Sequence, residues 1–172
     1  MSNRAAPLLD RLDTTVCVLT TAFEGRLAGC IVTYVTPASL DPDRPRVVVL
    51  TSHENLTHEL VGQSLVLALH PVARGQEDWV RHFGFRSGRE VDKFAGLAWE
   101  PGRTGAPLLA EALGWLEGRV VDSLDCGDHT ARLVEPVAVS LRDPAAVPLR
   151  AAEVYASGVD EPRAESVFPW ES

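Results

Sequence analysis

The sequence has little of what nucleic-acid-binding and membrane-spanning proteins require. Sixteen Lys and Arg residues stand against 24 Asp and Glu residues, so the formal net charge is −8 over 172 residues. Sequence-independent binding of nucleic acid depends on clustered positive charge, which argues against that function class. No apolar run approaches the ~18 residues of a membrane-spanning helix, and residues 1–13 lack the apolar core of a secretion signal. We therefore expect a cytoplasmic protein without nucleic-acid or membrane partners.

Cysteine is also scarce, and the three that are present do not make a disulfide framework. Cys17, Cys30 and Cys126 are an odd and widely spaced set, whereas disulfide scaffolds use dense, even sets. Cys17 and Cys30 lie in apolar segments, where we predict small core residues. Cys126 and His129 have a spacing that could chelate zinc, but no second Cys/His pair lies nearby. We predict no metal site.

The motifs of several enzyme classes are missing as well. No two glycines have the i, i+2 spacing that opens the dinucleotide fingerprint, so a Rossmann site is unsupported. The sequence contains neither a Gly-x-x-x-x-Gly-Lys loop nor a Gly-x-Ser-x-Gly elbow. Carboxylates are plentiful but scattered, which does not indicate hydrolysis by paired acids.

Segments rich in β-branched and apolar residues predict a series of strands. Residues 15–21 and 26–35 are expected to form a hairpin around a turn at Glu24-Gly25. Residues 46–51 are a nearly continuous apolar run, which is typical of a strand covered on both faces. Further strands are predicted at 64–70, 115–124, 129–141 and 149–155, with a hairpin turn at 125–128.

Only short helices are indicated. Asn55 or Thr57 can cap a helix that ends at Gly62, residues 76–83 space their apolar side chains as a helix does, and residues 108–113 are a third candidate. Many strands, few helices and no regular strand–helix alternation favour a closed or sandwiched β architecture. We expect one domain over residues 1–172, with its core at about 13–156.

Three polar clusters are candidates for a binding site. The strand that ends near Thr33 and Ser39 offers hydroxyls and backbone N–H groups to a flat polar cofactor or a phosphate, or it is an ordinary strand exit. Residues 52–58 combine a helix N-terminus with polar side chains, which suits an anion, or they form a plain capped helix. Residues 86–93 hold two arginines and Lys93, the only lysine, either to bind an anionic ligand or as a solvated loop.

The segment 29–42 resembles the flavin reductase family, whose FMN-binding split barrel carries a similar Gly-x-x-x-Ser/Thr-…-Ser-Leu-x-Pro pattern. The resemblance covers most of the chain, from about Thr15 to Leu141, in the order that the family has. It continues in Asn55-Leu56-Thr57-His58-Glu59-Leu60, Asp92-Lys93-Phe94, Gly105-Ala106-Pro107-Leu108-Leu109, Trp115-Leu116-Glu117-Gly118-Arg119-Val120-Val121 and Gly127-Asp128-His129-Thr130.

The resemblance implies a mainly β fold, a six-stranded antiparallel split β-barrel of Greek-key order with a few short helices. It implies a homodimer with FMN, or FAD, at the subunit interface. Family members pass hydride from the nicotinamide of NADH or NADPH to flavin N5, often to supply a partner monooxygenase. The expected function is therefore that of an NAD(P)H-dependent flavin reductase. Two alternatives stay open: a non-catalytic flavin carrier or sensor, and a flavoenzyme that acts on another small molecule.

Carried over by position, the resemblance also implies roles for individual residues. His129 would sit where the nicotinamide stacks and is the one candidate for a catalytic contact. Residues of the strand end would line the isoalloxazine ring and ribityl chain, and residues of the other two clusters would approach the phosphate or pack beside it. The cofactor-binding candidates are Thr33, Tyr34, Ser39, Leu40, His53, Asn55, Thr57, Ser87, Lys93 and Phe94.

The sequence departs from the family pattern at the strand end. The family usually has further hydroxyls where this chain has Ile31, Tyr34, Pro37 and Ala38. Fewer side-chain hydrogen bonds would shift recognition of the flavin toward backbone groups. These departures motivate the carrier or sensor alternative.

Overall fold

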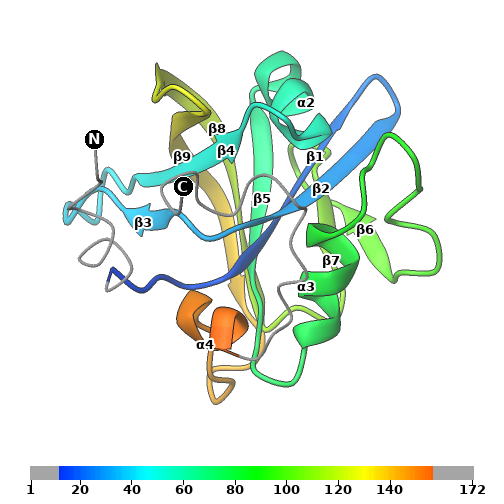
Figure 1. Cartoon of the computed structure of the whole chain (residues 1–172). Coiled ribbons are helices and arrows are strands. Elements are labelled where there is room, and N and C mark those ends of the chain that lie inside the picture. The colour runs from blue at the N-terminus through cyan, green and yellow to red at the C-terminus, as the bar shows by residue number, and fades with distance from the viewer. Residues whose placement is uncertain (1–11, 157–172) are drawn as a thin grey trace, which may run out of the picture.

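An antiparallel sheet forms the body of the protein, and the computed structural model describes residues 12–156 (Figure 1). Seven strands lie in the order β2-β1-β5-β8-β9-β4-β3. They are β1 (Cys17–Phe23), β2 (Arg26–Val32), β3 (Val35–Pro37), β4 (Val47–Ser52), β5 (Val66–Pro71), β8 (Gly114–Asp125) and β9 (His129–Leu141). A second sheet pairs β6 (Trp99–Pro101) with β7 (Pro107–Leu109), and the helices are α2 (Leu56–Ser64), α3 (Glu77–Gly84) and α4 (Ala151–Ala156).

The prediction of a mainly β, antiparallel fold with few short helices is confirmed, but the expected count of six strands is wrong. The segment predicted as one strand over 26–35 ends at Val32, and the chain then crosses to pair Val35 with Val49 as a separate strand, β3. Within residues 12–156, no ladder joins the edge strands β2 and β3, so the sheet is not closed into a barrel.

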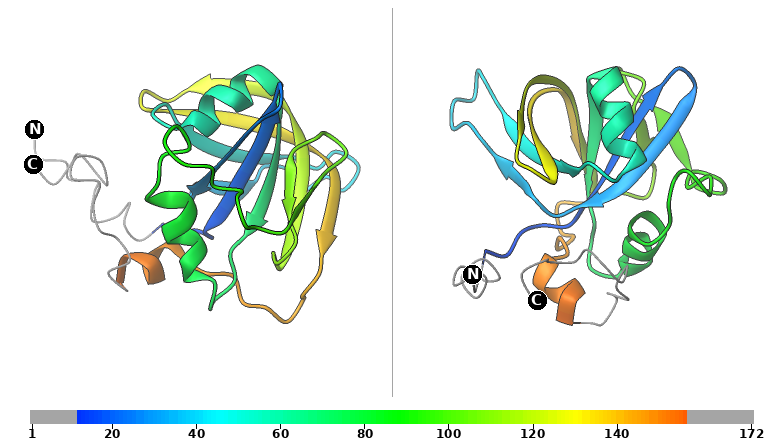
Figure 2. Two further views of the ribbon diagram at one scale, coloured as in Figure 1. Left: turned by 90° about the vertical axis from the view of Figure 1, so that its right-hand side faces the viewer. Right: turned by 45° about the horizontal axis from the view of Figure 1, so that its top comes forward.

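The sheet curves around one buried core, as the views in Figure 2 show. Cys30 and Val32 of the edge strand β2 share this core with Val49 of β4, which lies at the other end of the strand order. Cys17 and Cys30 are buried free thiols here, as the sequence predicts. Burying apolar surface stabilises a fold by roughly 25 cal/mol per Å², so this shared core favours the curvature.

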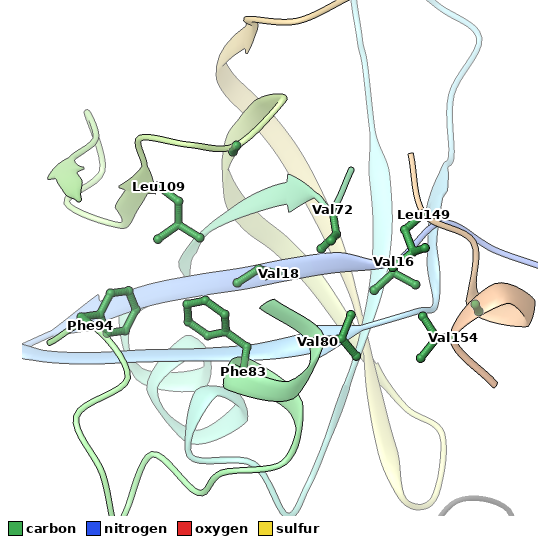
Figure 3. Close-up of a cluster of buried hydrophobic side chains, with 11 residues drawn as sticks. Val16, Val18, Val72, Val80, Phe83, Phe94, Leu109, Leu149 and Val154 are labelled. Carbon is green, nitrogen blue, oxygen red and sulfur yellow. The ribbon is translucent and has the colours of Figure 1, made fainter. Parts of the chain in front are cut away.

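A second apolar cluster covers the outer face of β1 (Figure 3). Val18 alternates with Cys17 and Leu19 along this strand, so that Val18, like Val16 just before the strand, belongs to the outer cluster and the other two belong to the inner core. This explains why β1 reads as a continuous apolar run rather than an alternating one. Residues of α3, α4 and the loops supply the rest of the cluster, among them Val80, Phe83, Phe94, Leu109 and Val154.

Gly29 allows α3 to approach the edge strand β2 closely. A Cβ atom at this position would lie 2.9 Å from Cε1 of Phe83, closer than side chains pack. Because Phe83 fills the centre of the outer cluster, the glycine at the start of the segment 29–42 has a packing role here.

Two predicted elements are wrong. Residues 108–113 do not form a helix, since Leu108 and Leu109 belong to β7 and pair with β6. Residues 149–155 are not a strand, since Ala151–Ala156 form α4. Its start is capped from outside the segment by Asp13, whose carboxylate accepts a hydrogen bond from Ala152 N at 3.0 Å.

The sequence predicts no membrane-spanning helix, and the length and apolar character of the observed helices bear on this prediction. None of the helices in the described residues is both long enough and apolar enough to cross a bilayer.

Candidate functional site

A cavity of about 640 Å³ lies between the first half of β2, the start of α2 and the segment 88–94. This volume falls within the range of small-molecule sites, roughly 300–1,000 Å³. Residues of the edge strand form one wall, and a polar loop with two basic and two acidic side chains forms the other. The lining residues are Gly25, Arg26, Leu27, Ala28, Gly29, Leu56, Gly88, Arg89, Glu90, Val91, Asp92, Lys93 and Phe94.

Lys93 fastens the loop wall of this cavity to the edge of the sheet. Its Nζ donates to the carbonyl oxygens of Gly29 at 3.0 Å and Phe83 at 2.7 Å, and the residue is only 6% exposed. Phe94 is buried in the outer cluster, with its ring centroid 6.0 Å from that of Phe83. Both predicted site residues therefore line the cavity, while the ammonium of Lys93 and the ring of Phe94 are engaged by the protein itself.

Arg89 ties the same loop to α2, and Ser87 stabilises the loop itself. The Ser87 hydroxyl accepts a hydrogen bond from Arg89 N at 3.2 Å, while the Arg89 guanidinium pairs with both carboxylate oxygens of Glu59. This contact lowers the pKa of the Glu59 carboxyl. The loop and the first turn of α2 are thus held as one unit at the mouth of the cavity.

The start of α2 differs from the predicted side-chain arrangement. Asn55 is the N-cap residue by backbone position, but its side chain makes no capping hydrogen bond. Thr57 is 2% exposed and hydrogen bonds to the thiol of Cys30. Desolvation by burial is the main cause of the raised pKa of that thiol. Asn55 therefore stays available to a ligand, whereas the Thr57 hydroxyl faces the interior.

A group of aromatic and histidine side chains lies where β3, β4 and β9 meet, and we call His53, His58, His129 and Tyr34 the histidine face. The register that pairs Ser52 with His129 brings these elements together. The Tyr34 and His129 rings meet edge-on with centroids 6.0 Å apart, and those of His53 and His58 are 4.8 Å apart.

Hydrogen bonds hold two of these histidines in place. His53 Nε2 lies 3.0 Å from the Thr130 hydroxyl, and His129 Nδ1 lies 2.9 Å from the Asp128 carboxylate. The hydrogen bond from His129 lowers the pKa of Asp128. Within residues 12–156, these side chains do not come together with others as a group of three or more possible metal ligands.

The predicted residues after the strand end are spread along the chain. Ser39 accepts a hydrogen bond from Asp41 N at 3.1 Å, so its hydroxyl is engaged in the turn of its own loop. Leu40 is fully exposed, and Thr33 is half-buried. The structure therefore brings Tyr34, His53 and His129 together at the histidine face. It places Lys93 and Phe94 in the cavity lining, whereas Ser87 precedes the lining segment, and Leu56 at the start of α2 also lines the cavity.

Sequence reasoning included His58 in the candidate cluster 52–58 without giving it a role of its own, and it missed Arg132. Arg132 is 4% exposed on β9 and donates from Nε to Thr51 Oγ1 at 3.2 Å and from Nη2 to His58 O at 3.1 Å. Its inward position could have been found, because it alternates with the buried Val134 on an apolar strand. Its contact with α2 spans 74 positions and leaves no local signal.

We predict that Lys93→Met lowers the free energy of unfolding by about 2 kcal/mol, because two buried carbonyl oxygens lose their donor. Urea unfolding of the purified variant measures this. Arg86→Met, at an exposed position of the same loop, is the control and should stay within about 0.5 kcal/mol of the parent. Unchanged stability together with weaker FMN binding would contradict the structural role and support a direct contact of Lys93 with the ligand.

Comparisons with known proteins agree with this architecture. The family model described as "Flavin reductase like domain" matches residues 9–157. The chain is 32% identical over 133 residues to "FMN reductase (NADH) RutF 2" of Rhizobium rhizogenes, which covers 77% of this chain and 75% of that protein. The solved structure "Streptomyces globisporus C-1027 NADH:FAD oxidoreductase SgcE6" aligns with a TM-score of 0.76 and 27% identity, over 86% of each chain.

Some relatives are much longer than this chain. It is 35% identical over 112 residues to "High molecular weight rubredoxin" of Moorella thermoacetica, over 63% of this chain but only 45% of that protein. It covers 21% of "Putative diflavin flavoprotein A 3" of Synechocystis sp., with 32% identity over 130 residues. In these proteins the matching region is one part of a larger whole. Because the family model spans the sheet, the cavity and the histidine face, the chain belongs to the flavin reductase-like domain family.

Proposed function

We propose that this protein is an FMN- or FAD-binding oxidoreductase that reduces flavin with NADH or NADPH. The observation that carries the proposal is the family match over residues 9–157, which includes both the cavity and the histidine face. Relatives named as FMN reductase (NADH) and NADH:FAD oxidoreductase, matched over at least 75% of their length, support the same activity.

The residues at the site fit a flavin nucleotide. The cavity has the volume of a small-molecule site, and Arg26 lines it at the start of β2. Arg89 and Lys93 also line it, but they are engaged by Glu59 and by backbone carbonyl oxygens, so Arg26 is the side chain that would meet an anionic phosphate. Tyr34 and His129 present rings beside the exit of the edge strand. When bound, the flavin supplies the redox chemistry, and the protein supplies position and electrostatics.

We assign the chain's own residues positioning roles. Ser39 and Leu40 would contact the flavin through backbone groups, because the Ser39 hydroxyl is engaged by Asp41 N and the Leu40 side chain points into solvent. Thr33 and Tyr34 would line the ring. Asn55 and His53 would lie near the phosphate, with Ser87 holding the loop in place. Thr57, Lys93 and Phe94 would support the site from the interior.

The direct experiment is an absorption spectrum of the purified protein before and after addition of NADH. We expect flavin bands near those of free FMN or FAD, bleaching of these bands under anaerobic NADH or NADPH, and NADH consumption that rises with added flavin. A protein that stays colourless in a flavin titration, or a bound flavin that neither nicotinamide reduces, would contradict the proposal.

We predict that His129→Ala raises KM for NADH about tenfold, since one ring contact to the nicotinamide is lost. The kcat should change much less, because hydride transfer needs no acid or base from the protein. Steady-state kinetics over a range of NADH concentrations separate the two constants, and the dissociation constant for FMN of the same variant is the control. A lower kcat at unchanged KM would show that His129 acts in the chemical step instead.

We further propose that two copies pair to complete the flavin site, and that the curved sheet is the split barrel of the family. The fully exposed Leu40 and the exposed Val121 and Leu124 of β8 support pairing, since these apolar side chains have no cover in one chain. Light scattering should give twice the chain mass of 18.6 kDa. A mass of one chain, with flavin bound, would contradict it.

The proposed physiological role is to supply reduced flavin to a partner monooxygenase in the cytoplasm. We propose that the chain forms a single domain, with its core at residues 13–156. The relative "4-hydroxyphenylacetate 3-monooxygenase reductase component" of Klebsiella oxytoca, 32% identical over 126 residues, supports such a partner. Hydroxylation by a candidate monooxygenase that depends on this protein and NADH would test it.

A flavin carrier is the second candidate. At the strand end this chain has Pro37 and Ala38 where the family usually has side chains with hydroxyls. The solved structure "FMN-binding protein from Thermus thermophilus with bound p-hydroxybenzaldehyde" aligns with 30% identity and a TM-score of 0.69, over 74% of this chain and 71% of that one. Stopped-flow mixing of the flavin-loaded protein with NADH and NADPH distinguishes the two. Absence of reduction by either would favour the carrier.

A further inference from the structure

Residues 86–92, which lead into the loop wall of the cavity and form most of it, make their backbone hydrogen bonds among themselves. Glu90 N and Val91 N both donate to Ser87 O at 3.1 Å, and Arg89 N donates to the Ser87 hydroxyl at 3.2 Å. Five of the seven residues are exposed. The segment is therefore a compact turn whose internal bonds do not depend on the body of the protein.

A single ion pair joins this turn to the body of the protein. Nη1 of Arg89 lies 3.3 Å from Oε2 of Glu59, and Nη2 donates to the other carboxylate oxygen. Within residues 12–156, no other hydrogen bond or ion pair runs from residues 86–92 to α2 or to the sheet. Both side chains are nearly half exposed, at 46% and 45%, so water competes for the two charges and the pair is weak.

Both ends of the turn are fixed more firmly. Phe85 precedes it as the C-cap residue of α3. At the other end, the buried ammonium of Lys93 donates to the carbonyl oxygens of Gly29 and Phe83. Phe94 then enters the outer cluster beside Phe83 (Figure 3). A segment that is fixed at both ends and held between them by one exposed pair can swing about those ends while the fold stays intact.

In its observed position the turn covers an apolar part of the cavity. A Cβ atom at Gly88 would lie 3.4 Å from Cδ2 of Leu56, so the backbone of the turn passes directly over that side chain. Leu56 and Ala28 both line the cavity, yet they are only 8% and 2% exposed. Movement of the turn away from α2 would therefore uncover this side of the cavity and widen its mouth.

We propose that residues 86–92 are a lid over the cavity, which turns about Phe85 and Lys93 and is latched shut by the Arg89–Glu59 ion pair. This inference rests on the proposed function, because the ligand that the lid would admit and retain is the flavin nucleotide. Glu59 does not line the cavity, so it acts on the ligand only through Arg89. The residue that holds the latch is thus separate from the residues that line the site.

Stopped-flow fluorescence of FMN measures how fast the ligand enters and leaves. Glu59→Ala and Arg89→Ala each remove the latch. We expect the association and dissociation rate constants to rise together by about three- to fivefold, as loss of a weak ion pair allows, while the dissociation constant stays within about twofold of the parent. A latch acts on entry and exit alike, whereas loss of a direct contact with the ligand changes the dissociation constant.

Asp78→Ala is the matched control. Asp78 lies in the first turn of α3 and forms an exposed ion pair with Arg81 at 2.9 Å, and its loss should leave both rate constants unchanged. Rate constants of Glu59→Ala equal to those of the parent, or a change confined to dissociation, would overturn the lid while the proposed function survives. A parent that binds no FMN would overturn the proposed function instead.

The lid can also be tested without flavin, through a thiol placed beneath it. Leu56→Cys supplies this thiol, Cys126→Ser removes the exposed native one, and the two cysteines that remain are buried. The rate of reaction with an aromatic disulfide reagent then reports opening. Adding Glu59→Ala should speed the reaction about three- to fivefold, and adding Asp78→Ala should not. Equal rates with and without Glu59→Ala would overturn the latch, whatever the protein binds.

Discussion

Replacing Glu117 by alanine is expected to lower the free energy of unfolding by about 4 kcal/mol, the largest loss that we predict for a single residue. Glu117 lies in β8 with 0% exposure and faces the outer side of the sheet. Its carboxylate accepts hydrogen bonds from Arg103 N at 3.0 Å, from Thr104 N, and from the Thr104 hydroxyl at 2.6 Å. Alanine would leave these donors without a partner and open a void beneath the loop.

The effect of Glu117 extends to the whole β6–β7 hairpin. The loop between these strands carries Gly102, where a Cβ atom would lie 2.4 Å from Oε1 of Glu117, so the backbone closes directly over the carboxylate. The same hairpin is held on its other side by the Thr20 hydroxyl, which donates to Pro107 O at 2.6 Å. Losing Glu117 should therefore speed hydrogen exchange across residues 101–107 before the sheet itself opens.

Chemical unfolding with a matched glutamate tests this prediction. Glu135 of β9 makes an exposed ion pair with Arg46 at 3.4 Å, and Glu135→Ala should change stability by less than about 1 kcal/mol. Glu117→Gln keeps one acceptor oxygen and should lose about half as much as the alanine variant. If Glu117→Ala and Glu135→Ala lose the same small amount, the carboxylate does not hold the hairpin.

The elements that the sequence predicts well depend on neighbouring residues alone. The turn at Glu24-Gly25 places both residues at positive φ, 49° and 78°, which a two-residue hairpin loop demands and glycine permits. The α2 helix begins after Asn55, one of the two residues proposed to cap it. The long strands β8 and β9 follow their apolar pattern around the expected turn. In each case the deciding interaction lies within a few residues.

The elements that the sequence predicts poorly depend on distant partners. The helix α4 is stabilised by Asp13, which accepts a hydrogen bond from Ala152 N, 139 positions away. The end of β2 after Val32 depends on the pairing of β3 with β4, and no pattern in residues 26–35 indicates this pairing. Propensity is a weak signal over such short segments, and tertiary contacts override it.

The candidate site also has features that the sequence predicts and features that only the fold shows. The resemblance placed Tyr34, His53 and His129 at one site, and the structure brings them together at the histidine face. Residue type alone could not show that the Lys93 ammonium turns toward carbonyl oxygens of β2 and α3. Likewise, Arg132 and the residues that it contacts come from separate elements, and only the fold makes them neighbours.

Lowering the pH from 6.5 to 4 is expected to cost the folded protein about 3 kcal/mol through a single residue, His70. This histidine is fully buried on β5 between β1 and β7. Leu109 N donates to its Nε2 at 3.2 Å, so Nδ1 carries the proton and donates to Val18 O at 3.2 Å. A second proton on Nε2 would displace the Leu109 N–H and place an unpaired charge in the interior.

The sign of the effect follows from the direction of the shift. Burial lowers the pKa of His70 from 6.5 to about 4. Between pH 4 and 6.5 this histidine is therefore mostly protonated in the unfolded chain and mostly neutral in the folded protein. The free energy of unfolding therefore falls as the pH drops through this window and levels off below about pH 4. His70→Asn should be less stable at pH 7, but its stability should fall less steeply between pH 6.5 and 4, and the difference between the two curves isolates His70. A His70 ring whose NMR shifts titrate near pH 6.5, or two parallel stability curves, would contradict this account.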